Sequence, residues 1–221
     1  MTAVTSSDPS VALEPDAASA EFRFRLLDGM AAAIRERGFR LTTVADVVRH
    51  ARTSRRTFYE HFTSKQDCYV ALLRESNAGM IEQIAAAVDP HAPWDAQVRQ
   101  AIAAWLGASE SEPEITLSWI REIPSLGDDA RQLQRDFLES FIVLIQTLSD
   151  SPELRAAGVQ PVSRPVAIML LGGLRELMAT TVEDGGRLGD IMAVAVDATM
   201  AMIGPRQPAN PTRQRSSTKP S

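Results

Sequence analysis

The stretch Leu41–Asp67 reads LTTVADVVRHARTSRRTFYEHFTSKQD. Its pattern predicts two short helices joined by a tight turn, followed by the start of a third helix. Thr43 and Asp46 stand three residues apart at the start of an apolar repeat. This is the spacing of a capping box, in which each side chain bonds the main-chain N–H of the other residue. The pattern predicts a first helix over residues 44–51, with its three valines and its last alanine facing inward.

A second short helix is predicted over residues 55–62, after a turn of three residues. Ser54 is placed to cap it, and Phe58 and Phe62, one helical turn apart, anchor it to a core. The opposite face then carries polar and basic side chains. The S-K-Q-D pattern that follows predicts a further capped helix over residues 64–88.

The first turn of the second short helix is rich in side chains that read DNA. In a helix–turn–helix, the N-terminal residues of the second helix reach base edges in the major groove, where arginine pairs with guanine and a threonine methyl group contacts thymine. Here these residues are Ser54, Arg55, Arg56 and Thr57. Phosphate contacts, which position the protein, are predicted for Thr43, Tyr59, His61 and Lys65. The alternative is an ordinary exposed amphipathic helix.

Charge is distributed unevenly along the chain, whose formal net charge is −5. Residues 21–65 hold ten Lys and Arg against five Asp and Glu, whereas residues 66–203 hold nine against twenty. A basic N-terminal part on an acidic body would orient the protein on DNA. The alternative is chance clustering on a solvated surface.

Apolar periodicity predicts an all-α chain of about nine helices and no strands. In the expected helix over residues 19–37, an apolar stripe is predicted to face the core; it consists of Phe24, Leu27, Ala31 and Ile34. Gly38 is expected to end this helix in left-handed geometry. The expected helices cover residues 19–37, 44–51, 55–62, 64–88, 94–108, 114–123, 128–149, 164–183 and 188–203.

The segment TTVADVVRHARTSRRTFYEHFTSK resembles the TetR family of bacterial transcriptional regulators. The residues that carry the resemblance are Thr43, Val47, Ala51, Ser54, Thr57, Tyr59, His61, Phe62 and Lys65. It implies a homodimer that binds a palindromic operator in double-stranded DNA and is commonly released by a small molecule. One residue departs from the family pattern: Arg52 stands at the turn position usually held by glycine. Either the turn tolerates it at a cost of about 1 kcal/mol, or the turn geometry differs; its charge could also contact a phosphate.

Composition predicts a disordered segment over 1–18 and a disordered basic tail over 204–221. Between them we expect a helix–turn–helix domain over 19–65 and a helical domain over 66–203, for which the resemblance implies ligand binding and dimerisation. The apolar helices 164–183 and 188–203 would pair with a second copy, the alternative being burial within one chain. A largely apolar effector would lie among the aromatic residues of the middle helices. The pocket candidates are Trp105, Trp119 and Phe141.

Other classes of function find little support in the sequence. The single cysteine, Cys68, fits a reducing cytoplasm, and at a helix N-terminus it is either a redox sensor or core filler. The three histidines lack zinc-ligand spacing, and we expect no cofactor, no catalytic group and no membrane span. A helical protein-interaction adaptor that has lost DNA binding is the remaining alternative, favoured by the acidic body and Arg52.

Overall fold

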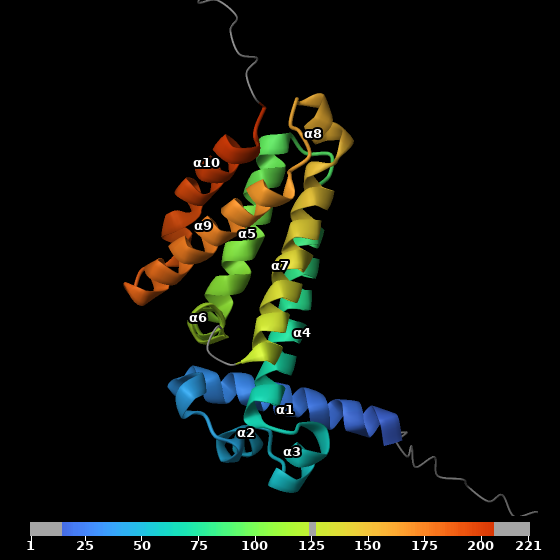
Figure 1. The fold of residues 1–221 in the computed structure, drawn as a ribbon, viewed down its shortest axis with the longest axis vertical. Coiled ribbons are helices and arrows are strands. Elements are labelled where there is room, and N and C mark those ends of the chain that lie inside the picture. Colours follow the sequence, from blue (N-terminus) through green and yellow to red (C-terminus); the bar gives the residue numbers. More distant parts are fainter. Residues whose placement is uncertain (1–14, 124–126, 206–221) are drawn as a thin grey trace, which may run out of the picture. The chain divides into compact units, whose positions relative to one another are not determined.

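The computed structural model describes residues 15–123 and 127–205, and every regular element in these ranges is a helix (Figure 1). The predicted all-α class is therefore confirmed. The elements are α1 (Pro15–Leu41), α2 (Val44–His50), α3 (Arg55–His61), α4 (Lys65–Ala87), α5 (Trp94–Ser111), α6 (Pro113–Glu122), α7 (Asp128–Ser149), α8 (Pro152–Ala156), α9 (Arg164–Glu183), the 3-10 helix η2 (Leu188–Ile191) and α10 (Met192–Ile203).

Two elements differ from the sequence prediction. Helix α8 lies where a loop is expected; it begins at Pro152, and the Ser151 side chain accepts a hydrogen bond from the Leu154 N–H. Five residues are too few to show a helical period, so this helix escapes detection. The last predicted helix, over 188–203, begins as the 3-10 turn η2 and becomes α-helical at Met192.

The chain divides into two compact units. The N-terminal unit comprises residues 1–80 and 108–137, and the C-terminal unit comprises residues 81–107 and 138–221. Helices α4, α5 and α7 each contribute residues to both units. Helix α6 and the first part of α7 belong to the same unit as α1–α3. The proposed disordered segments fall largely outside the described residues, although α1 already begins at Pro15.

Helix α1 forms the centre of the N-terminal unit and packs against α2, α3 and α6. Leu27, Ala31 and Ile34 are buried as predicted, but Phe24 is 68% exposed, so its assignment to the core was wrong. The first turns of α1 extend beyond the helices that cover its middle (Figure 1). Near Phe24 the buried face of α1 is formed by Leu26 and Leu27, and Phe24 lies on the solvent side.

Helices α1 and α2 approach each other most closely at Gly29. A Cβ atom there would lie 2.6 Å from the Val47 carbonyl oxygen and 2.9 Å from the Ala51 nitrogen. At the end of α1, Gly38 has φ 75°, and the buried Phe39 stacks on Tyr69 of α4 with 4.0 Å between ring centroids. The φ of Gly38 is positive as predicted, but its ψ of 159° is not that of a left-handed helix cap, and α1 continues beyond this kink to Leu41.

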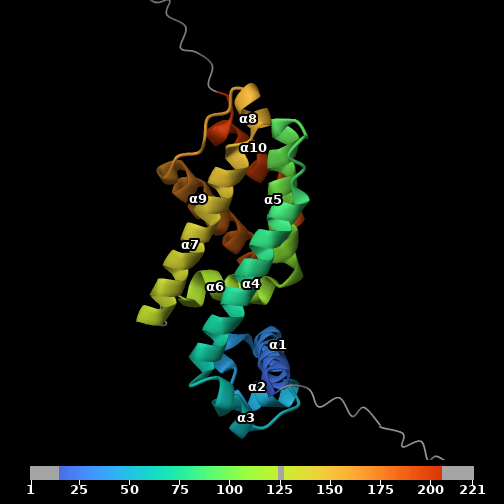
Figure 2. The ribbon, with the colours of Figure 1, turned by 90° about the vertical axis from the view of Figure 1, so that its right-hand side faces the viewer.

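The C-terminal unit surrounds an apolar core with helical segments. One buried cluster contains Ile142 of α7, Val162 just before α9, and Ala167 of α9. Helices α9 and α10 contact each other and run side by side in both views (Figures 1 and 2). By length and composition alone, with a mean hydropathy of 1.3, α9 is the one helix in the described residues that could cross a membrane. The sequence analysis expected no membrane span, because Arg175 and Glu176 interrupt the run of apolar residues in this helix.

Candidate nucleic-acid interface and internal cavity

The predicted capping box at the start of α2 is present. The Thr43 N–H donates to Asp46 Oδ2 at 3.0 Å, and the Asp46 N–H donates to Thr43 Oγ1 at 3.3 Å. Hydrogen bonds from the Thr43 side chain and main chain lower the pKa of Asp46. The box fixes the direction in which the chain enters α2, and it leaves the Thr43 side chain exposed at the helix N-terminus.

Helix α3 is held by its cap and by two buried aromatic rings. Ser54 Oγ accepts a hydrogen bond from the Thr57 N–H at 3.0 Å, and Phe58 and Phe62 are buried. The opposite face of the helix is open to solvent. It carries Arg55, Arg56 and Tyr59 as exposed side chains, with Thr57 and His61 half-buried beside them. The arrangement is that of a recognition helix seated on a rigid base.

The turn between α2 and α3 contains a left-handed residue that is not glycine. Arg52 has φ 49°, so the turn keeps the usual left-handed geometry and tolerates an arginine in it. A single guanidinium nitrogen of Arg25, Nη2, donates to the carbonyl oxygen of Ala51 at 2.6 Å and to that of Arg52 at 2.8 Å. Arg25 therefore clamps the turn from α1, and nothing in the sequence pattern pointed to this role.

Lys65 occupies a different position from the one expected of a phosphate contact. Its ammonium group donates to the carbonyl oxygens of Phe39 at 2.9 Å, Thr42 at 2.9 Å and Arg40 at 3.4 Å, and lies 4.3 Å from the centroid of the Phe39 ring. Burial lowers the pKa of Lys65. An ammonium group has three hydrogens, and these carbonyl oxygens can take all of them. A phosphate contact, as expected from the sequence, would have to displace one of these bonds. In this structure Lys65 ties the end of α1 to the start of α4.

Most of the basic side chains of residues 21–65 are already paired within the protein. Six of the ten lie beside a carboxylate: Arg23 with Glu75, Arg35 with Glu112, Arg37 and Arg49 with Glu36, Arg40 with Glu122, and Arg56 with Glu60. Arg25 and Lys65 donate to main-chain carbonyls. Of these ten residues, all of which the structure describes, the two without a carboxylate or carbonyl partner are Arg52 and Arg55. Unpaired positive charge therefore concentrates at the turn and the first turn of α3.

A buried polar chain links α4 to α6 inside the N-terminal unit. Tyr69 Oη and Ser118 Oγ lie 2.6 Å apart, and Ser118 Oγ donates to Glu122 Oε2 at 2.9 Å. Because the Ser118 hydrogen is used on Glu122, the Tyr69 hydroxyl is the donor to Ser118. Burial raises the pKa of Tyr69. The chain connects the helix that follows the recognition helix to α6.

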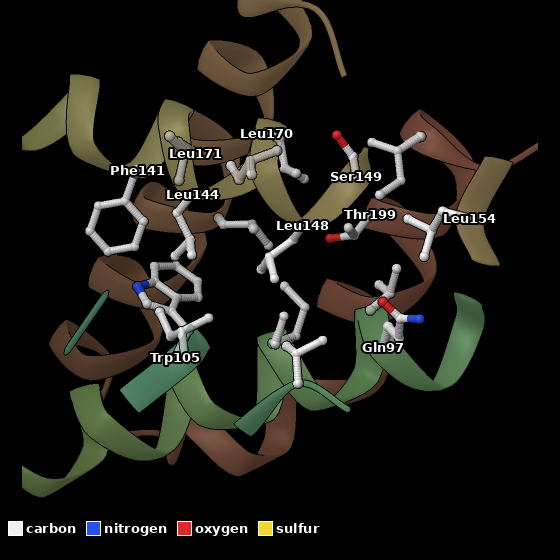
Figure 3. A pocket seen from close by; sticks show the side chains of 18 residues that line it. Gln97, Trp105, Phe141, Leu144, Leu148, Ser149, Leu154, Leu170, Leu171 and Thr199 are labelled. Carbon is white, nitrogen blue, oxygen red and sulfur yellow. The ribbon is translucent and has the colours of Figure 1, made fainter. Parts of the chain in front are cut away.

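A partly open cavity of about 100 Å³ lies within the C-terminal unit (Figure 3). It is walled by side chains from α4, α5, α7, α8, α9 and α10, most of them Leu, Ile and Val. Trp105 and Phe141, two of the three pocket candidates, line it. Trp119 does not; it belongs to the N-terminal unit, where its ring packs on Phe137 with 4.1 Å between centroids. Helical spacing could not separate these aromatic residues, because the distinction depends on which unit each one joins.

Cys68 does not have the surroundings of a reactive thiol. It is fully buried, and burial raises its pKa to about 12, which is opposite to the shift a redox sensor needs. Cys68 is therefore core filler. Within the described ranges no group of three or more His, Cys, Asp or Glu side chains could hold a metal ion.

Residues 26–72, from α1 to the early part of α4, match the family model described as bacterial regulatory proteins, tetR family. Over this range the chain is similar to that family. The match spans the capping box at the start of α2, the turn and α3.

Solved structures extend the TetR-type fold beyond this domain. FadR from Bacillus subtilis, in complex with stearoyl-CoA, is 15% identical to this chain, with a TM-score of 0.68 over 83% of this chain and 99% of that one. The reduced form of NemR from E. coli is 16% identical, with a TM-score of 0.69 over 86% of this chain and 100% of that one. FadR from Bacillus halodurans gives a TM-score of 0.69 at 14% identity, over 83% of this chain and 99% of that one. No curated protein is similar enough in sequence to count as a relative.

Proposed function

We propose that this chain is a transcriptional repressor that binds a palindromic operator as a homodimer and leaves it when a small molecule fills the cavity. One observation carries the DNA assignment: Arg52 and Arg55 have no carboxylate or carbonyl partner at the turn and the start of α3, while the other eight basic residues of 21–65 each have one. Internal pairing removes sequence-independent attraction elsewhere and directs binding to one face.

The side chains of this face divide into two groups by the contacts they can make. Arg55, Arg56 and the Thr57 methyl group are proposed to read base edges, since they lie in the first turn of α3, behind the Ser54 cap. Phosphate contacts are proposed for Arg52, Thr43, Tyr59 and His61, which flank that turn. Arg56 would exchange its exposed partner Glu60 for DNA at little cost, because exposed ion pairs contribute weakly.

The DNA assignment is tested by titrating the protein against its own upstream DNA at several salt concentrations. Arg55→Ala should weaken specific binding by about 1–3 kcal/mol and reduce discrimination between operator variants. Arg52→Ala should weaken binding to all sequences and lower the salt slope by about 1. Arg74→Ala, an exposed arginine of α4, is the matched control. Unchanged operator affinity in Arg55→Ala would refute the reading assignment, and no salt-sensitive binding by the wild type would favour the adaptor.

The homodimer is proposed to form through α9 and α10, the helices expected to pair from the sequence. Ile168 and Met169 of α9 and Val194 of α10 are large apolar side chains left exposed. Cβ atoms added at Gly172 and Gly173 would meet nothing within 4 Å. Two glycines in mid-helix cost stability unless something packs closely on them, and a second copy of the same face supplies that contact.

Analytical ultracentrifugation tests this interface. The double variant Met169→Glu, Val194→Glu should sediment as a monomer and lose cooperative operator binding, because it places four like charges in the proposed interface. Val143→Glu is the matched control: Val143 is 53% exposed on α7 of the same unit, outside the proposed face. A double variant that remains dimeric would place the interface elsewhere.

Repression is separated from activation by a reporter fused to the upstream region. Repression predicts higher expression in a strain that lacks the protein and in one that carries Arg55→Ala. Lower expression in both strains would instead show activation and would overturn the repressor proposal while leaving the DNA assignment intact.

A further inference from the structure

We propose that the cavity of the C-terminal unit takes a small neutral molecule with an apolar body and one hydrogen-bond donor, in the manner of an alkylphenol or a short alcohol. The inference rests on the proposed function, in which this cavity holds the effector. It specifies the chemistry that the effector must present.

The walls of the cavity select an apolar body. Trp105 and Phe141 stand at one end, and leucines such as Leu144, Leu148 and Leu170 form the sides (Figure 3). Among the residues that the structure describes, no Lys, Arg, His, Asp or Glu lines the cavity. A carboxylate or an ammonium would therefore lose its water without gaining a partner of opposite charge, which is strongly unfavourable.

Gln97 turns an acceptor toward this space. Its side-chain nitrogen donates to the carbonyl oxygens of Pro90 at 3.0 Å and Ala92 at 2.8 Å, so both amide hydrogens are used in holding the α4–α5 connection. Two carbonyl partners fix which atom is nitrogen, because an oxygen placed there would face two acceptors. The amide oxygen remains, and Figure 3 shows it on the cavity side of the side chain.

Thr199 supplies a second acceptor. Its hydroxyl hydrogen is used on the Ala195 carbonyl oxygen at 2.7 Å, which leaves the oxygen lone pairs directed to the cavity (Figure 3). Ser149, the remaining polar side chain nearby, also has no free hydrogen: its Oγ accepts from the Val162 N–H and donates to the main-chain oxygen of Gln146, both at 3.1 Å. Every polar position still open at this end can therefore only accept hydrogen bonds.

The ligand must consequently bring the hydrogen. A hydroxyl or N–H group satisfies Gln97 Oε1 or Thr199 Oγ1, whereas an ether or a ketone leaves these oxygens facing another acceptor. Apart from the hydrogens already used by Gln97, Thr199 and Ser149, the polar hydrogen on a lining side chain is that of the Trp105 indole. Trp105 lies at the opposite end of the cavity from Gln97 in Figure 3. A donor at the Gln97 end and a ring at the Trp105 end define one orientation.

The cavity volume limits the size of the ligand. At about 100 Å³ the space is smaller than the 150 Å³ apolar cavity that accommodates benzene in a protein core, but this pocket is partly open. One small ring is therefore the expected scale, with any short substituent extending toward the opening. Small matched probes suit the test because they differ in a single polar group.

Isothermal titration of the full-length protein with 4-ethylphenol, 4-ethylanisole and 4-ethylbenzoate tests the inference. All three share a ring and an ethyl group, and they present a donor, an acceptor and an anion respectively. We expect 4-ethylphenol to bind at least about tenfold more tightly than the ether and the benzoate not to bind. An ether or a benzoate that binds as tightly as the phenol, or the absence of binding by all three, would overturn the proposal.

Variants locate the acceptor. Thr199→Val keeps the shape of the side chain and removes the oxygen, and Gln97→Met removes the amide. The preference for 4-ethylphenol over 4-ethylanisole should shrink to about twofold in at least one of them, with circular dichroism confirming the fold. Thr181→Val is the matched control, because Thr181 Oγ1 bonds the Leu177 carbonyl in the same way at 2.7 Å and does not line the cavity. Full retention of the preference in both cavity variants would refute the donor assignment.

Binding is measured without DNA, so failures of the two proposals can be told apart. If 4-ethylphenol binds with the expected preference but operator release does not follow, the cavity chemistry stands and its regulatory role falls. If none of the probes binds while Arg55-dependent operator binding remains, the cavity inference falls and the DNA assignment stands.

Discussion

Arg25 of α1 holds Arg52 of the turn in place: one guanidinium nitrogen donates to the Arg52 carbonyl oxygen at 2.8 Å and to the preceding Ala51 oxygen at 2.6 Å. The clamped residue is the one with φ 49°, where a side chain costs free energy. A charged donor on two otherwise open carbonyls at the end of α2 offsets that cost. The position of the recognition helix therefore depends on a side chain of α1.

Arg25→Ala should lower the free energy of unfolding by about 1–3 kcal/mol and weaken operator binding, because two carbonyl oxygens lose a charged donor and the turn is released. Urea denaturation and a gel-shift titration measure the two effects. Arg23→Ala is the control, since Arg23 makes an exposed pair with Glu75 at 3.5 Å and should change stability by less than about 1 kcal/mol. Equal effects of the two variants would show that the clamp contributes nothing.

Arg52→Gly should raise the free energy of unfolding by up to about 1 kcal/mol, because glycine adopts positive φ without the Cβ penalty. Arg52→Ala keeps the strained geometry and should show no such gain. Both variants lose the same charge and should weaken DNA binding alike. Denaturation curves of the pair separate strain from charge, and a stabilised Ala variant would contradict the strain argument.

Gly29→Ala should destabilise the N-terminal unit by about 1–3 kcal/mol and impair DNA binding, because its Cβ atom would lie 2.6 Å from the Val47 carbonyl oxygen and push α2 away from α1. Gly79→Ala in α4 is the matched control. Nothing lies within 4 Å of a Cβ atom there, so helix propensity should stabilise that variant by up to about 1 kcal/mol. Thermal unfolding of both variants checks the opposite signs.

Lys65→Met should lower the free energy of unfolding by about 1–3 kcal/mol, because the carbonyls of Phe39 and Thr42 lose their charged donor. The salt slope of DNA binding should stay as in the wild type, unlike that of Arg52→Ala. Salt-dependent titrations of these two variants make the comparison. A reduced slope in Lys65→Met with unchanged stability would restore the phosphate role expected from the sequence.

Acid should weaken the N-terminal unit through Glu36. Hydrogen bonds from Arg49, Arg37 and His50 lower the pKa of Glu36 from 4.5 to about 2. A carboxylate whose folded-state pKa is depressed contributes stability that is present above pH 4.5 and is lost as the pH falls toward 2. Glu36→Gln should flatten the dependence of the unfolding free energy on pH across this window. The difference should shrink at high salt, since the group is exposed; an unchanged pH profile would argue against the cluster.

Much of the DNA-binding domain could be predicted from the sequence because its determinants are local. The caps of α2 and α3 join residues three apart, Thr43 with Asp46 and Ser54 with Thr57. Phe58 and Phe62 share a face because four residues complete about one helical turn. Such interactions act within a single helix end or face, so residue types and spacing suffice to place them.

Tertiary structure decided what the individual side chains do. Arg25 meets Ala51 across 26 residues and Lys65 meets Thr42 across 23, so no local pattern could show that one holds the turn and the other the end of α1. The same holds for Trp105, which lines the cavity, and Trp119, which joins the other unit. Spacing along the chain determines helices and their faces, whereas the partner of a side chain depends on which distant segment folds against it.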